Sequence, residues 1–362
     1  MGRLPETGSR LDALRGLLAP SCVDGLVVTT LENVRYLSGF TGSSAALLIT
    51  EATALLVTDT RYAEQSASET QGFEIEVAGG VPACVATRRA GTKRVGFEAG
   101  GVSYDVWETL RSVAQEAPGA SLVPCRGLVE GLRIVKDADE LELLQRAVDI
   151  ASEAFEQTLP PVKPGAVERD LALEIEFRMK QAGAEDLAFD LIVASGARSS
   201  LPHGRASDRR LGEREFVVFD IGARFRGYHS DMTRTVFMGR PEKRARDLYH
   251  AVLGAQQAAV DAIKPGVTAG RIDAAARGFI DEAVWPGRFG HGTGHGVGLQ
   301  VHEAPRVGPG SEQPLKPGMV LTVEPGIYEP GEGGVRIEDI VVVTETGHRV
   351  MTPTPKDRWT LE

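Results

Sequence analysis

Five side chains able to bind metal ions lie within or beside apolar, strand-like segments of the last third of the chain. Four are acids, and the fifth is a histidine set among glycines. They are Asp220 in FVVFDIGA, Asp231 in GYHSDMTRT, His295 in GHGTGHGVG, Glu324 in LTVEPGIY and Glu338 in GVRIEDIVV. An isolated carboxylate is costly to desolvate in such surroundings, and two closely spaced cations that share the carboxylates would remove that cost. The pattern therefore predicts a two-metal hydrolase.

The spacing of the two aspartates predicts that they face each other across a hairpin. Both of their segments are strand-like, and the polar turn ARFRG joins them. If the hairpin is symmetric about Phe225 and Arg226, Asp220 lies directly opposite Asp231, with the Cβ atoms roughly 4.5–5.5 Å apart. A cation between the two carboxylates would turn their repulsion into attraction. Two solvated acids on an edge hairpin are the alternative, and a β-bulge would break the alignment.

The two glutamates occupy strand positions that suit a shared site. Glu338 alternates with Arg336 on one face of a predicted strand, so Arg336 is expected to hydrogen-bond ligand carboxylates from behind. Glu324 closes the apolar run MVLTVE and is followed by Pro325-Gly326. Each acid alone is typical of an ordinary strand end. Only together with the aspartate pair do they predict a dinuclear centre.

Four of the seven histidines are candidates for this site: His203 in LPHG, His291 and His295 in HGTGHG, and His302 in QVHE. The glycines around His295 leave room for the close approach of a ligand. A phosphate cradle is a rival interpretation, but LQVHEAPRV supplies no following helix, and the spacing fits neither GxGxxG nor a Walker motif. Oxygen ligands with one imidazole and no cysteine suit Mn²⁺, Co²⁺ or Zn²⁺, and Mn²⁺ is the first choice.

Length and composition limit the class of protein. A chain of 362 residues predicts two domains. The net charge of −10 disfavours nucleic acid and anionic membranes as partners. Three scattered cysteines predict reduced thiols in the cytoplasm. We find no secretion signal at the N-terminus and no apolar run as long as a membrane span.

The elements that must position the site form an α/β (α+β) pattern. Short buried strands predicted at GLVVTT, ALLIT and ALLVTD, with the glycine- and serine-rich connection NVRYLSGFTGSS, begin a first domain of about 125 residues. Later, helix, Lys-Pro-Gly turn and helix occur twice, at Lys163-Pro164-Gly165 and Lys264-Pro265-Gly266. We interpret this as an internal duplication in which two helical hairpins cover one sheet built by both halves, with the site at their seam. Chance recurrence of a common turn is the alternative.

The ligand order Asp, Asp, His, Glu, Glu resembles that of the pita-bread metallopeptidases (family M24), which include methionine aminopeptidase, prolidase and aminopeptidase P. This resemblance runs from about residue 130 to 350. NVRYLSGFTGSSAALLIT and TDTRYAEQ resemble the creatinase-like domain of the Xaa-Pro peptidase branch, and LPHG, GHGTGHGVG, VHE, EPGIY and GVRIED resemble its signatures. The resemblance implies a creatinase-like domain over residues 1–130. It also implies a pita-bread catalytic domain with internal pseudo-twofold duplication over residues 131–362. Creatinase shares the fold without the metal ligands, so the intact set argues against it.

The resemblance implies hydrolysis of the bond before a proline in the second position, by a hydroxide that bridges two divalent metal ions. Asp220, Asp231, His295, Glu324 and Glu338 would be the ligands, and Glu324 would also move the proton. His203 and His302 resemble the catalytic pair that hydrogen-bonds substrate and tetrahedral intermediate, while His291, Tyr328 and Arg336 resemble supporting or pocket groups. The branch also implies a homodimer.

Prolidase, which acts on Xaa-Pro dipeptides, is favoured over aminopeptidase P, which acts on longer Xaa-Pro peptides. A dipeptidase must recognise a free carboxylate, and Arg35, Arg61 and Arg88–Arg89 are candidates for that contact. Methionine aminopeptidase usually lacks the N-terminal domain, and a non-catalytic peptide-binding module is expected to have lost ligands. Both are therefore weaker alternatives.

Overall fold

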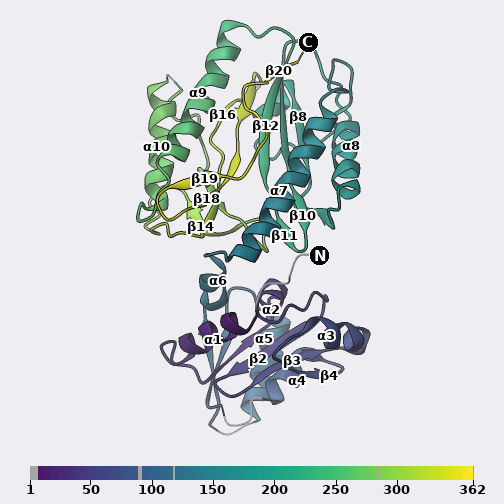
Figure 1. The fold of residues 1–362 in the computed structure, drawn as a ribbon, viewed down its shortest axis with the longest axis vertical. Helices are drawn as coiled ribbons and strands as arrows, with labels where there is room; N and C mark the ends of the chain where they lie inside the picture. Colours follow the sequence, from purple (N-terminus) through teal and green to yellow (C-terminus); the bar gives the residue numbers. More distant parts are fainter. Residues whose placement is uncertain (1–6, 89–91, 117–118, 284, 362) are drawn as a thin grey trace. The chain divides into compact units, whose positions relative to one another are not determined.

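The chain folds into two compact units, Met1–Arg133 and Ile134–Glu362. The computed structural model describes residues 7–88, 92–116, 119–283 and 285–361 (Figure 1). Within these ranges, no helix combines the length and the apolar character needed to cross a bilayer. The three cysteines are free thiols, with Cys125 buried and Cys22 exposed.

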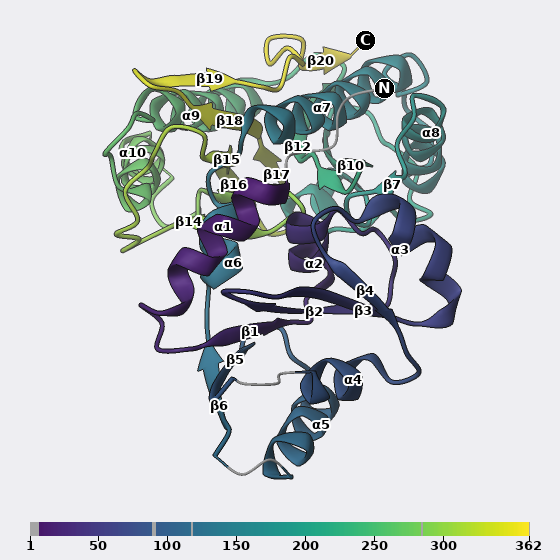
Figure 2. The same cartoon turned by 60° about the horizontal axis from the view of Figure 1, so that its bottom comes forward.

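The first unit is a six-stranded mixed sheet, in the order β4-β3-β2-β1-β5-β6, with helices on both faces. Its strands are β1 (Gly25–Val28), β2 (Ala45–Thr50), β3 (Ala54–Thr58), β4 (Glu74–Val77), β5 (Arg94–Glu98) and β6 (Ser121–Cys125). Its helices are α1 (Thr7–Leu18), α2 (Leu31–Ser38), α3 (Ala63–Glu69), α4 (Val81–Thr87), α5 (Tyr104–Gln115) and α6 (Leu128–Arg133), with a 3-10 turn at Thr60–Tyr62. Helices α1, α2 and α6 lie on one side of the sheet and α4 and α5 on the other (Figure 2). This double cover explains why the predicted strands β1 to β3 are buried on both faces.

The connection between β1 and β2 differs from the prediction, because α2 occupies half of it. Val34 and Leu37 are fully buried, and their spacing of three places both on the inner face of the helix. Gly39 ends α2 in the left-handed region, with φ of 81°, and its N–H donates to the Arg35 carbonyl. The glycine and serine residues mark the end of this helix rather than a loop throughout.

The first half of the second unit packs a helical hairpin on the four-stranded sheet β20-β12-β9-β8 (Figure 1). Its elements are α7 (Ala138–Thr158), α8 (Glu168–Gln181), β7 (Asp186–Leu187), β8 (Ile192–Ser195), a 3-10 turn (Gly196–Ser200), β9 (Phe216–Ile221), β10 (Ala223–Phe225), β11 (Tyr228–His229) and β12 (Met232–Met238), joined by β20 (Thr360–Leu361). Strands β11, β10 and β7 form a small separate sheet.

The second half repeats this plan with a second hairpin on the sheet β14-β13-β15-β18-β19. Its elements are α9 (Lys243–Asp261), α10 (Ala269–Glu282), β13 (Gly294–Gly296), β14 (Glu303–Val307), β15 (Val320–Val323), β16 (Gly326–Glu329), β17 (Gly333–Arg336), β18 (Asp339–Val343) and β19 (His348–Val350). The prediction of one sheet shared by both halves is wrong. Strand β12 is paired with β9 along almost its whole length and with β20 at its end, so the second half forms its own sheet beside it.

The two Lys-Pro-Gly turns have the same hydrogen bonds, as a duplication requires. Gly165 and Gly266 have φ of 88° and 81°, values that favour glycine. The Gly165 N–H donates to the Leu211 carbonyl at 2.7 Å, and the Gly266 N–H donates to the Leu315 carbonyl at 2.8 Å. The N–H of each leucine donates in return to the residue after its glycine, at 2.8 Å in both halves. The predicted internal duplication is therefore confirmed.

The hairpin that carries the two aspartates has a different register from the predicted one. Asp220 pairs with Thr233, not with Asp231. The chain turns at Arg226-Gly227, where φ is 46° and 77°, as a two-residue type I′ turn requires. The centre of the hairpin is thus one residue later than predicted, which shifts the pairing by two positions. Asp231 and Thr233 remain on one face, so the aspartates are diagonal rather than direct neighbours.

Two glycines beside His295 permit close packing of backbone rather than entry of a ligand. A Cβ atom at Gly294 would lie 2.1 Å from the Thr322 carbonyl oxygen, and one at Gly296 would lie 2.0 Å from the Ala304 carbonyl oxygen. Strand β13 is held between β14 and β15 at these points. The predicted role of these glycines is therefore corrected: they allow the neighbouring strands to fix the His295 backbone.

This packing predicts opposite effects for two glycine-to-alanine substitutions. Gly296→Ala would push a methyl group into the Ala304 carbonyl, so we expect it to lower the free energy of unfolding by about 1–3 kcal/mol. Gly278→Ala lies on exposed α10 surface with no atom within 4 Å, so it should raise that free energy by about 0.5–1 kcal/mol. Denaturant titration measures both. Equal stability of the two variants would contradict this account of β13.

Candidate metal centre and active site

One cavity of about 860 Å³ in the second unit is lined by every candidate site residue. Those candidates are His203, Asp220, Asp231, His291, His295, His302, Glu324, Tyr328, Arg336 and Glu338. They come from segments up to 135 residues apart in the sequence, from both halves of the duplication. The fold thus brings together residues that the sequence could relate only by type and order.

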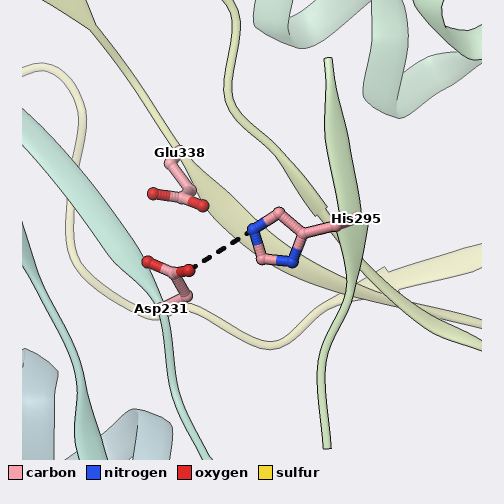
Figure 3. A group of neighbouring side chains, drawn as sticks. All are labelled: Asp231, His295 and Glu338. Carbon is pink, nitrogen blue, oxygen red and sulfur yellow. Dashed lines mark ion pairs between the residues drawn. The ribbon is translucent and has the colours of Figure 1, made fainter. Parts of the chain in front are cut away.

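Three of the five predicted ligands form a compact group of Asp231, His295 and Glu338. One potential ligand atom from each lies within 4.8 Å of the others, and the three side chains point toward one another (Figure 3). Asp231 directly precedes β12, His295 is in the middle of β13, and Glu338 lies between β17 and β18. Asp220 and Glu324 line the same cavity around this group.

The imidazole of His295 is arranged as a metal ligand would be. Its Nδ1 atom lies 2.9 Å from the Gly296 carbonyl, which requires an N–H on Nδ1 and leaves a lone pair on Nε2. Nε2 lies 3.6 Å from Asp231 Oδ2 and 3.4 Å from Glu324 Oε1. Burial lowers the pKa of His295 to about 4, so the ring is neutral at pH 7. A lone pair that faces two ionised carboxylates is unfavourable unless a proton or a metal cation lies between them.

The buried acids repel one another strongly enough to change their protonation. Burial raises the pKa of Asp231, and the Glu338, Asp220 and Glu324 carboxylates raise it further. Burial and the neighbouring Glu324 and Asp220 likewise raise the pKa of Glu338. Burial raises the pKa of Glu324 to about 8, although Arg336 opposes this effect. Without cations, the site therefore holds protons at pH 7 that an exposed acid would have released.

Two carboxylate oxygens have the geometry of unfilled ligands. Asp220 Oδ1 and Glu338 Oε1 are buried and, in the described part of the chain, have no hydrogen-bond partner. The other oxygen of each is held: Asp220 Oδ2 accepts from Arg336 Nη2 at 2.6 Å, and Glu338 Oε2 accepts from Thr233 Oγ1 at 2.8 Å. Buried carboxylate oxygens beside one neutral imidazole fit a divalent cation of intermediate hardness. The residues present therefore fit the predicted metal ions.

A chain of hydrogen bonds orients Asp220 from behind. Arg336 donates to Asp220 through Nη2 and to the Tyr328 hydroxyl oxygen through Nη1 at 2.9 Å. Tyr328 donates its own proton to His291 Nε2 at 3.0 Å, and His291 Nδ1 lies 2.8 Å from the Gly292 carbonyl. This direction requires a neutral His291, and burial lowers the pKa of His291 to about 4. Arg336 thus contacts a ligand carboxylate, but that carboxylate belongs to Asp220 rather than to Glu338.

His203 and His302 lie at the solvent-exposed side of the cavity. The His302 ring lies edge-on to His295, with 4.3 Å between the ring centroids. His203 belongs to the turn before Arg205, whose N–H donates to the His203 carbonyl at 3.0 Å. Both imidazoles can therefore reach a molecule that enters the cavity, and their catalytic roles stay predictions.

Two residues of the cavity region were not predicted from the sequence. Thr233 donates to Glu338 and accepts a hydrogen bond from Arg336 Nε at 3.0 Å, so it links both groups. Its position two residues after Asp231 in HSDMTRT was the available signal, because alternate strand residues share a face. Arg306 lines the cavity and has no ion-pair partner among residues 7–88, 92–116, 119–283 and 285–361. No sequence pattern distinguished it from other exposed arginines.

The arginines proposed from the sequence as carboxylate contacts lie in the first unit. Arg61 forms an ion pair with Asp59 at 2.8 Å, and Arg88 forms one with Glu76 at 2.6 Å. Both guanidinium groups are therefore already engaged. Arg89 lies outside the described residues. Within the second unit, Arg306 is the better placed candidate because it lines the cavity itself.

The fold and the site define a class of protein. Residues 142–345 match metallopeptidase family M24, and residues 10–135 match the creatinase/prolidase N-terminal domain. The chain belongs to metallopeptidase family M24. The predicted fold, a creatinase-type first domain followed by a pita-bread domain, is confirmed.

Relatives within this family carry more specific names. A Pyrococcus horikoshii Xaa-Pro dipeptidase is 37% identical over 337 residues, which cover 92% of this chain and 94% of that protein. The solved structure of a Bacillus anthracis Xaa-Pro dipeptidase has a TM-score of 0.94 and 41% identity, and the match covers 98% and 100% of the two chains. An X-Pro aminopeptidase structure from Thermotoga maritima has a TM-score of 0.88 and 36% identity, with 97% and 99% covered.

The raised carboxyl pKa values predict how pH changes the stability of the metal-free protein. The pKa of Glu324 is about 8 in the folded protein and roughly 4.3 in the unfolded chain. Its protonation therefore stabilises the fold fully below roughly pH 4.3, and this contribution is lost as the pH rises through about 8. The lowered pKa values of His291 and His295 act in the opposite direction, but only below roughly pH 6.5. Between pH 6.5 and 8, we therefore expect the free energy of unfolding to fall by about 1–2 kcal/mol for Glu324 alone.

Denaturant titrations of chelated protein at pH 6.5 and 8 test this expectation. Glu324→Gln removes the titrating group and should reduce the difference between the two pH values. Saturating Mn²⁺ should abolish the loss at pH 8, because cations stabilise the ionised carboxylates. A chelated wild-type protein that is equally stable at both pH values would contradict the assigned electrostatics.

Proposed function

We propose that this protein is a metal-dependent Xaa-Pro dipeptidase that hydrolyses the bond before a proline in the second position. The observation that carries the proposal is the convergence of Asp231, His295 and Glu338, with Asp220 and Glu324, in one cavity where buried carboxylate oxygens have no partner. Membership of family M24 supports peptide hydrolysis, and the names of the relatives support proline selectivity.

The proposed cofactor is a pair of divalent cations held by Asp220, Asp231, His295, Glu324 and Glu338. Mn²⁺ is the first choice, and Zn²⁺ or Co²⁺ would suit the same donors. Such ions would lower the pKa of a water molecule towards neutrality and polarise the carbonyl of the scissile bond. The neutral His295 and the free oxygens of Asp220 and Glu338 support this assignment.

The remaining residues would handle the substrate and its protons. The proline nitrogen carries no N–H in the peptide, so it must gain a proton when the C–N bond breaks. Glu324 would accept a proton from the attacking water and pass it to that nitrogen. His203 and His302, at the open side of the cavity, would hydrogen-bond the substrate and the developing oxyanion. Arg336, Tyr328 and His291 would keep Asp220 in its position.

Arg306 would provide the selectivity for dipeptides. A dipeptide carries a free carboxylate on its proline, and a guanidinium without another partner is the group best suited to bind it. The two further arginines of the cavity are already engaged: Arg205 forms an ion pair with Asp190 at 2.9 Å, and Arg336 forms one with Asp220 at 2.6 Å. The alternative function is aminopeptidase P activity on longer peptides, and similarity to the Thermotoga maritima X-Pro aminopeptidase supports it.

Further assignments accompany this function. Residues 1–130 would be the creatinase-like domain and residues 131–362 the catalytic domain. A homodimer rests on the resemblance to the Xaa-Pro peptidase branch, and a cytoplasmic location rests on the unpaired thiols. Proline-containing peptides would be the only partners required.

A peptide panel with metal-reconstituted enzyme tests the function. We expect chelated protein to be inactive, and Mn²⁺-loaded protein to hydrolyse Ala-Pro faster than Ala-Pro-Ala. Arg306→Gln should raise KM for Ala-Pro about 10–100-fold, since a hydrogen bond to a charged group contributes about 1.5–3 kcal/mol. Arg205→Gln is the matched control from the same cavity and should leave KM nearly unchanged.

Different outcomes of the panel would contradict different parts of the proposal. Equal rates on Ala-Pro and Ala-Pro-Ala would contradict strict dipeptide selectivity and favour aminopeptidase P. Cleavage of Met-Ala-Ser would point to methionine aminopeptidase. Unchanged peptide binding and no lost activity in both Asp220→Ala and His295→Ala would favour a non-catalytic peptide-binding module.

A further inference from the structure

The two halves of the second unit meet directly behind Glu338. The Glu338 N–H donates to the Thr233 carbonyl at 3.1 Å, and the Thr233 hydroxyl donates to the Glu338 carboxylate. Thr235 adds a second connection, because its hydroxyl donates to the Arg336 carbonyl at 2.8 Å. These contacts join β12 of the first half to residues 336–338 of the second. The distance between first-half and second-half ligands therefore depends on this seam.

A buried ion pair closes the seam on the side away from the cavity. Arg234 alternates with Thr233 and Thr235 along β12, so its side chain leaves the opposite face. Its Nη1 donates to the Glu338 carbonyl at 2.6 Å, and its Nη2 donates to Asp339 Oδ1 at 2.6 Å. The side chains of Arg234 and Asp339 are only 3% and 1% exposed. One guanidinium thus holds the backbone of a predicted ligand and the carboxylate of the next residue.

A segment distant in sequence completes this cluster. Residues 352–361, called the strap here, cross from β18 to β12. Within the strap, the Thr354 carbonyl accepts from Arg234 Nη2 at 2.7 Å, and Lys356 Nζ donates to Asp339 Oδ2 at 2.6 Å. Gln256 of α9 donates to the same Asp339 oxygen at 2.9 Å and accepts from Lys356 Nζ at 2.9 Å. Asp339 is therefore shared between a cation from β12 and a cation from the strap.

The strap itself is firmly attached at its far end. Trp359 stacks on Tyr249 of α9, with 4.1 Å between ring centroids and 7° between ring planes. The Tyr249 hydroxyl donates to the Lys356 carbonyl at 2.7 Å. Beyond it, β20 pairs in parallel with β12. These contacts fix the Lys356 backbone, so its ammonium group points at Asp339 and not into solvent.

We propose that Lys356 of the strap, together with Arg234 and Asp339, forms a positioning unit for the metal centre by fixing the Glu338 backbone relative to β12. This inference rests on the metal centre proposed above. Lys356 and Arg234 each pair with one carboxylate oxygen of Asp339 and direct this side chain away from the cavity. Because Lys356 takes one of the two oxygens, Arg234 can also donate to the Glu338 carbonyl. None of the three residues lines the cavity, so none contacts substrate or metal.

The charges in this cluster explain why loss of one member would be felt at Glu338. Asp339 is buried between two cations: Arg234 Nη2 and Lys356 Nζ each lie 2.6 Å from one of its two carboxylate oxygens. Removing a partner from a buried ionised carboxylate leaves its charge poorly compensated. Without Lys356, Arg234 would be the remaining cation of this cluster beside Asp339. Its guanidinium would then be drawn towards that carboxylate, and its hydrogen bonds to the Glu338 and Thr354 carbonyls would weaken.

Metal binding by Lys356→Met tests the inference without using catalysis. Side chains that orient ligands typically contribute 10–100-fold to metal affinity. We therefore expect isothermal titration with Mn²⁺ to give about 10–100-fold weaker binding for at least one ion. The visible absorption of the Co²⁺-loaded variant should also change, because it reports the geometry of the ligands. Lys356→Arg keeps the cation and should restore both properties towards those of the wild type.

Lys243→Met is the matched control, because Lys243 is 82% exposed and pairs with Asp247 on the surface of α9. It should bind metal like the wild type. A Lys356→Met variant that melts earlier but keeps wild-type affinity and Co²⁺ absorption would overturn the inference and leave the metal centre standing. If that variant does not fold, Asp339→Asn carries the same test with the same two readouts. A wild-type protein that binds no Mn²⁺ would instead overturn the metal centre, and this inference with it.

Discussion

The main physical constraint on the site is the electrostatic repulsion among four carboxylates, which the fold places around one histidine. Burial and mutual proximity raise the pKa values of Asp231, Glu338 and Glu324. Among the described residues, Arg336 is the one cation that forms an ion pair with these carboxylates, and its partner is Asp220. One guanidinium cannot balance four ionised carboxylates, so these acids retain protons when no other cation is present. A metal ion held among them would allow all four to ionise, which is the physical basis of the metal centre proposed above.

The duplicated architecture explains how these groups come together. Each half supplies its own helical hairpin and sheet, and a separate hydrophobic core fills each half. Asp220 and Asp231 belong to the first half, and the remaining three ligands belong to the second. Catalytic geometry therefore depends on how the halves are joined, through Thr233 on the cavity side and Arg234 on the other. Rigid elements that meet at a strongly bonded seam can hold ligands precisely without any ligand lying on a flexible loop.

Much of this account could be predicted from the sequence, because ligand type and strand periodicity are local signals. The five candidate ligands that line one cavity, the repeated Lys-Pro-Gly turns and the strand that ends before Glu324 all follow from such patterns. Register was predicted wrongly, since the positive φ of Arg226 moved the turn and a non-glycine residue gives little warning of it. Contacts between distant segments, such as Arg234 with Asp339, have no local signal at all. Arg306 was missed for the same reason, as only the folded chain shows that it lines the cavity.

The most direct test of the central claim is anomalous X-ray diffraction at the manganese edge from crystals grown with Mn²⁺. Two anomalous peaks are expected inside the cavity. Both should contact carboxylates from the group Asp220, Asp231, Glu324 and Glu338, and one should be bonded to His295 Nε2. A cavity without anomalous density at saturating Mn²⁺, with these carboxylates in the same positions, would contradict the central claim.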